Sequence, residues 1–253
     1  MRRFIRIAVP VVVVGGIFFF AFPKIADFSK VWTQLKAMTW LEVATLVLVA
    51  LWNLATYWLV MMAALPGSNV WQTMKVNQAS TAVANTLPGG GALGIGVTYS
   101  MFGEYGFPAR ATTLSILVSG IWNNFVKLGM PVVAIALLAI TGDVASSVLV
   151  ASIVGVIVLF VAIGMFAAVL RSESLAARVG ARLGKIANAL RKLLRKEPNV
   201  DLAEGTVRFR RDAIGLIRTR WLRLTITTLV SHLSLYLVLL MALRHVGVSE
   251  GEV

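Results

Sequence analysis

Long apolar segments are the feature of this sequence that most limits its fold. Residues 112–140, 144–170 and 224–243 are long, apolar and free of acidic side chains, and residues 41–64 form a further apolar segment. A helix needs about 20 apolar residues to cross ~30 Å of hydrocarbon. Only 14% of the residues are charged, against roughly 25% in soluble domains. The sequence therefore predicts an all-α integral membrane protein, a polytopic helix bundle.

A fifth candidate span, residues 7–22, follows three arginines and stops at Pro23 and Lys24. It has the length of a signal peptide, but no small-x-small cleavage site follows it, and further spans do. We therefore expect a short signal anchor and about five spans in all.

Basic residues are concentrated in residues 171–223, where fourteen basic and five acidic side chains give +9 of the total net charge of +13. A pI near 10.9 is also typical of nucleic-acid binding. A basic segment between spans fits the positive-inside rule better, so we place it in the cytoplasm and expect no nucleic-acid partner. The N-terminal arginines favour a cytoplasmic N-terminus. The lysines at 24, 30 and 36, which this topology places outside, oppose it.

Counting spans back from the cytoplasmic segment requires residues 76–106 to begin and end on the same side. They are apolar enough to enter the membrane, but Pro88-Gly89-Gly90-Gly91 interrupts them, and such a run cannot sustain a straight helix. A re-entrant pair of half-helices over residues 76–97 satisfies both conditions. A plain helix kink, or a cytoplasmic loop dipping to the interface, is the alternative.

The break suggests a binding site for a lipid head group. Irregular backbone at membrane depth is tolerated only where it is buried in protein or lines a watery cavity. Half-helix ends also present N–H groups that suit an anion. The candidate contacts are Asn77, Asn85, Pro88, Gly89, Gly90 and Gly91.

A polar stripe runs through the span at 112–140. It consists of side chains four residues apart, namely Ser115, Ser119, Asn123 and Lys127. A mid-span lysine costs roughly 2.5–3.5 kcal/mol on the insertion scale. We therefore expect Lys127 to face the protein interior within reach of the broken segment, although snorkelling to the interface is an alternative. Asn123, Asn124 and Lys127 complete the candidate site.

Three further side chains are candidate polar partners: Glu104, His232 and Tyr236. Glu104 could pair with Lys127 or Arg110, or lie solvated in a loop. A lone histidine in a span is more often an interhelical hydrogen-bonding partner than a proton relay. Asn53, with Thr56 and Tyr57, is expected to serve helix packing.

Catalysis is poorly supported by this sequence. It has two histidines, no HExxH motif, no P-loop, no paired carboxylates within a span and no cysteine. We expect no enzyme activity, no metal and no cofactor.

Within the basic segment, apolar residues recur at helical spacing: Val179, Leu183, Ile186, Leu190 and Leu193. Basic residues flank them, which is typical of an amphipathic helix lying on an anionic leaflet. A helical hairpin packed on the membrane domain would give the same pattern. Pro198-Asn199 separates this helix from a second basic stretch, residues 204–223, that runs into the last span. The chain is thus divided into membrane helices (1–170), a basic cytoplasmic segment (171–223) and a last span with a short external tail (224–253).

The order of features resembles a known family. The residues that carry the likeness are Asn77–Gly91, the turn at 103–107, the span around Ser119–Leu128 and the long basic segment before the last span. They resemble the membrane domain of bacterial lysylphosphatidylglycerol synthases and their stand-alone, flippase-like relatives. The resemblance implies a multi-pass protein of the bacterial inner membrane. It also implies that the chain is a truncated portion, because the family usually continues with more spans.

The resemblance further implies transbilayer movement of a lipid, such as an aminoacylated phospholipid or a lipid-linked sugar carrier. An anionic phospholipid or lipid-linked carrier would enter a polar cleft between the broken segment and the stripe, with Lys127 facing its phosphate. The absence of a soluble aminoacyl-transferase domain argues against synthase activity. The alternative function is a non-transporting scaffold that recruits a partner or anionic lipid through its basic segment.

Overall fold

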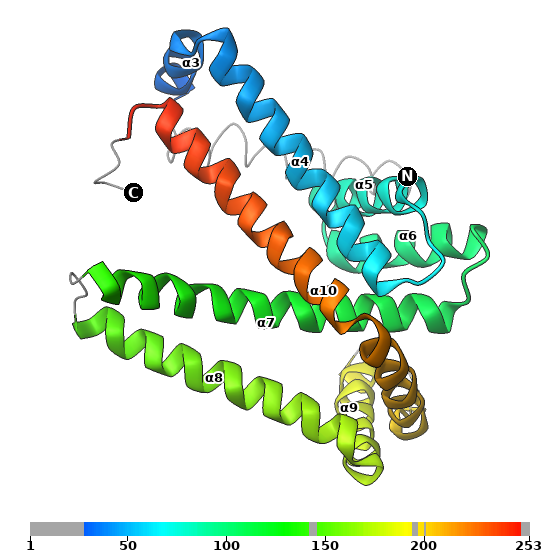
Figure 1. The fold of residues 1–253 in the computed structure, drawn as a ribbon. Helices are drawn as coiled ribbons and strands as arrows, with labels where there is room; N and C mark the ends of the chain where they lie inside the picture. The colour runs from blue at the N-terminus through cyan, green and yellow to red at the C-terminus, as the bar shows by residue number, and fades with distance from the viewer. Residues whose placement is uncertain (1–27, 142–145, 194–196, 200, 249–253) are drawn as a thin grey trace. The chain divides into compact units, whose positions relative to one another are not determined.

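A computed structural model describes residues 28–141, 146–193, 197–199 and 201–248 of the chain. Its helices are α3 (Phe28–Ala37), α4 (Trp40–Ala64), α5 (Val70–Thr86), α6 (Gly90–Glu104), α7 (Ala109–Thr141), α8 (Ser146–Arg171), α9 (Glu173–Leu193) and α10 (Ala203–His245). All the regular secondary structure in the described residues is helical (Figure 1), so the predicted fold class is confirmed.

Four of these helices contain segments that are long and apolar enough to cross a membrane: Trp40–Ala64, Ala109–Ile135, Ile153–Arg171 and Ala203–His245. Each overlaps one of the four apolar segments predicted at 41–64, 112–140, 144–170 and 224–243. The predicted first span, residues 7–22, lies outside the described residues. The protein is therefore a multi-pass membrane protein, and α10 carries the basic stretch into the last span as one continuous helix.

The described residues form two compact units. The first unit consists of the residues up to 62, residues 66–112 and the residues from 230 onward, and the second consists of residues 63–65 and 113–229.

In the first unit, buried polar side chains join α4 to α10. Asn53 donates its amide to the Ser234 hydroxyl at 2.8 Å and to the Ser231 carbonyl at 3.4 Å, and the hydroxyls of Thr56 and Ser234 lie 3.3 Å apart. All four residues are buried. Interhelical hydrogen bonds of this kind hold spans together where the hydrophobic effect cannot, because lipid is as apolar as the side chains. Asn53 and Thr56 therefore pack as predicted, whereas Tyr57 is exposed and the prediction for it is wrong.

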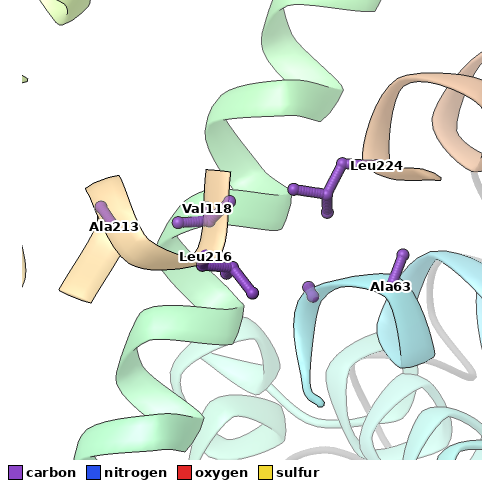
Figure 2. Close-up of a cluster of buried hydrophobic side chains, with 6 residues drawn as sticks. Ala63, Val118, Ala213, Leu216 and Leu224 are labelled. Carbon is purple, nitrogen blue, oxygen red and sulfur yellow. The ribbon is translucent and has the colours of Figure 1, made fainter. Parts of the chain in front are cut away.

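In the second unit, a core forms around α7 and α10. Its buried members are Ala63, Ala64, Val118, Ala213, Leu216 and Leu224, and Figure 2 shows them around one stretch of α7. Beside this core, the Trp122 indole N–H donates to the Thr225 hydroxyl at 3.0 Å. Trp122 also packs edge-on against Phe166 of α8, with ring centroids 6.3 Å apart. These contacts hold α7, α8 and the middle of α10 together.

Candidate functional site

The predicted break at Pro88 separates α5 from α6. Leu87 is extended, at φ −110° and ψ 140°, because the residue before a proline is disfavoured in the helical region. Gly89 then takes a left-handed conformation, at φ +70°, which glycine adopts without steric cost. The Gly90 N–H donates to the Leu87 carbonyl at 2.8 Å and closes the turn. Three residues thus end one helix and start the next.

The two helices pack backbone against backbone. A Cβ added to Gly94 would lie 2.7 Å from the Ser80 carbonyl oxygen, and one added to Gly90 would collide with the carbonyl oxygen of Ala84. The contacts run in opposite directions along the two helices, so α5 and α6 form an antiparallel hairpin. The prediction of two half-helices with Pro88–Gly91 at the turn is confirmed. Entry of this hairpin into the membrane stays a prediction.

Local contacts close the base of the hairpin. Asn69 and Gln72 form a reciprocal capping box at the start of α5, each side chain accepting from the backbone of the other at 3.0 Å. Beyond the end of α6, the Phe107 N–H donates to the Phe102 carbonyl at 2.9 Å. The Phe102 and Phe107 rings meet edge-on at 5.6 Å. The hairpin is therefore closed at both ends by its own sequence.

The hairpin gathers some of its candidate residues at the turn and separates others. Asn85, Pro88, Gly89 and Gly91 are exposed there together. Asn77 is half-buried two turns earlier on α5, about 12 Å along the helix axis. The structure buries Gly90 between the helices, so Gly90 serves packing. The segment from residue 76 to residue 103 carries no Asp, Glu, Lys, Arg or His. The exposed tip therefore offers amide and backbone groups, and no fixed charge.

The polar stripe on α7 belongs to the second unit, and it turns outward along the helix. Ser115 is buried, Ser119 and Asn123 are half-buried, and Lys127 is exposed. The side chain of Lys127 is therefore not enclosed within the second unit, and its approach to the broken segment stays a prediction. Positions four residues apart advance by about 40° around an α-helix, so twelve residues rotate the stripe by about 120°. Asn124 is exposed, and its amide donates to the Gly120 carbonyl of its own helix at 2.9 Å.

The remaining candidates do not converge on the hairpin tip. Glu104 is exposed in the last turn of α6, at the opposite end of the hairpin from Pro88. On α10, His232 is half-buried and Tyr236 is 52% exposed. Ser231 and Ser234, which accept hydrogen bonds from Asn53, were not among the predicted residues. Ser231 and Ser234 are three residues apart, as are Asn53 and Thr56. This equal spacing was the one sequence feature that could have indicated the pairing.

Among the residues that the structure describes, no group of three or more His, Asp or Glu side chains could hold a metal ion. The exposed tip of the hairpin can donate and accept hydrogen bonds, so it could bind a polar ligand without reacting with it.

The comparison with family models agrees with a multi-pass membrane protein. Residues 7–251 match the family model described as the lysylphosphatidylglycerol synthase TM region. No curated protein and no solved structure matches the chain.

Proposed function

The chain belongs to the family of the lysylphosphatidylglycerol synthase transmembrane region, and from this membership we propose that it moves a phospholipid or a lipid-linked head group across the bacterial inner membrane. In this proposal the protein acts as a non-catalytic, flippase-like membrane domain. Its basic segment and its N-terminus lie in the cytoplasm, as the distribution of basic residues favours.

The antiparallel hairpin is the observation that carries this proposal. α5 has 17 residues and α6 has 15, so they are about 25 Å and 22 Å long, and neither crosses ~30 Å of hydrocarbon. A hairpin of this length that enters from one face would place its tip inside the bilayer. Broken helices of this kind build the substrate sites of many transporters.

The tip has the groups that such a site needs. Asn85 offers an amide in the last turn of α5, and the start of α6 carries the positive end of a helix dipole. Both favour the phosphate of a lipid head group without a fixed counter-charge. Weak, neutral contacts let a head group leave as well as enter, while its acyl chains remain in the hydrocarbon.

The first test removes the tip amide. Asn85→Leu keeps the γ-branched shape of the side chain and removes its capacity to form hydrogen bonds. We expect the rate of lipid translocation to fall roughly tenfold, the value of one hydrogen bond to a charged group. The rate is measured in reconstituted vesicles as dithionite quenching of NBD-labelled phosphatidylglycerol that reaches the outer leaflet.

Thr86→Val is the matched control, because the Thr86 hydroxyl is already bonded to the Ala82 carbonyl of its own helix at 2.7 Å. It should keep the wild-type rate. Equal rates for Asn85→Leu and Thr86→Val would remove the tip from the site. A wild-type chain that moves no lipid in this assay would favour the scaffold alternative.

A second test concerns Lys127, whose exposed ammonium could pair with a lipid phosphate. Lys127→Met should leave the protein folded and inserted while lowering the same rate, and Lys127→Arg should retain part of it. Lys75→Met, which removes an exposed lysine from α5, should have no effect on the rate. Translocation by Lys127→Met at the wild-type rate would make this lysine structural.

A further inference from the structure

Helix α9 begins directly after the C-terminal end of α8. Only Ser172 separates the two helices, and its hydroxyl accepts from the Leu175 N–H at 3.2 Å. Arg210 of α10 fixes this corner, since its guanidinium lies 3.4 Å from the Arg171 carbonyl oxygen and 3.7 Å from the Glu173 carboxylate. Figure 1 shows α9 turning away from the axis of α8 at this point. The end of an apolar span therefore fixes where α9 starts.

The packed face of α9 consists of small residues. Ala176, Gly180 and Gly184 are buried and share one side of the helix. A Cβ added to Gly180 would lie 2.5 Å from the Leu202 carbonyl oxygen and 2.9 Å from the Ala203 Cα. α9 therefore meets the start of α10 at Gly180, where the two backbones are in contact.

The large apolar residues of α9 are not on that packed face. Leu183, Ile186, Leu190 and Leu193 are 49%, 58%, 56% and 80% exposed. Among the residues that the structure describes, nothing covers these four side chains. Four large apolar side chains in one sector of a helix need a covering surface, since water does not solvate them favourably.

Charge identifies what this covering surface is. Residues 174–193 hold five basic residues and no acidic one. On a helical projection the apolar sector lies between the glycine face and a sector of exposed basic residues, namely Arg178, Arg182, Lys185 and Lys192. Long basic side chains beside an inserted apolar face reach lipid phosphates.

We propose that α9 lies in the head-group layer of an anionic leaflet, with Leu183, Ile186, Leu190 and Leu193 facing the acyl chains. The basic sector contacts phosphates of anionic phospholipids, which attract each nearby lysine or arginine. The glycine face holds α9 against α10. The protein therefore contacts one side of α9, and lipid contacts its apolar sector. This surface and the hairpin tip share no residue, and the proposal does not depend on lipid translocation.

The test uses spin labels in the full chain, which has no cysteine to remove. One label is placed by Ile186→Cys, and the control label by Ala181→Cys. Ala181 is exposed and lies about 140° around α9 from Ile186. Both labelled proteins should unfold at the temperature of the unlabelled chain. They are reconstituted into vesicles that contain phosphatidylglycerol.

We expect the Ile186 label to be several-fold more accessible to oxygen, relative to an aqueous nickel reagent, than the Ala181 label. Replacing the four basic residues by glutamine should reduce the difference in accessibility between the two labels in phosphatidylglycerol vesicles. The reduced difference should approach the one that the unsubstituted chain shows in phosphatidylcholine vesicles. Equal aqueous accessibility of both labels would overturn the proposal. So would protection of Ile186 that disappears when the protein is diluted with lipid, because a second copy of the chain would then be the cover.

Discussion

Gly94→Val is expected to separate α5 from α6 and to abolish lipid translocation. The valine Cβ would lie 2.7 Å from the Ser80 carbonyl oxygen, and neither backbone can move aside without opening the hairpin. We expect a loss of about 3 kcal/mol or more in the free energy of unfolding, at the upper end of overpacking costs. Thermal unfolding in detergent and the vesicle assay measure the two effects.

Gly96→Val provides the matched control on the same helix. A Cβ at Gly96 would meet nothing within 4 Å, and valine forms helices slightly better than glycine. This variant should therefore unfold at or slightly above the wild-type temperature. If both variants were destabilised equally, the loss of glycine itself would be responsible, and the close packing of α5 on α6 would be disproved.

Leu224→Ala is expected to destabilise the second unit by about 2–5 kcal/mol, the usual cost of a cavity left by a buried leucine. Leu224 is fully buried in the cluster with Ala213, Leu216 and Val118 (Figure 2). Its loss leaves a void that lipid cannot fill, because the surrounding helices exclude lipid as they exclude water. Chemical or thermal unfolding of the purified protein measures the change.

Ile226→Ala is the control, two residues along α10. Ile226 is 50% exposed, so truncation there leaves space that lipid or detergent can occupy. Its effect should be a small fraction of that of Leu224→Ala. Similar effects at the two positions would mean that Leu224 is not enclosed by protein.

Much of the fold could be predicted because its strongest determinants are local in sequence. Apolar length located four spans. Pro88 with its glycines placed the hairpin turn at Pro88–Gly91, which overlaps the observed break at Leu87–Gly89. A proline and a left-handed glycine constrain the backbone wherever they stand.

Predictions that required knowing which side of a helix packs were less successful. The spacing of the stripe predicts a slow drift around α7, and this drift is large enough to carry the stripe from buried Ser115 to exposed Lys127. On α9, the hydrophobic pattern selected the leucines as candidates for contact with lipid or with other helices. The contact with α10 is made by Gly180 instead. Close backbone approach selects for small residues, which an apolar pattern does not show. The bonds between Asn53 and Ser234 join residues 181 positions apart, and one sequence alone does not pair them.

The uncharged tip of the hairpin also bears on the source of energy for transport. Coupling to a proton gradient requires a side chain that gains and loses a proton during the cycle, and residues 76–103 contain no carboxylate, lysine, arginine or imidazole. A head group held only by this tip would meet no carboxylate, ammonium, guanidinium or imidazole of that segment. A proton-driven cycle would therefore have to place its titrating group on another helix, whereas downhill scrambling of lipid between leaflets would need none.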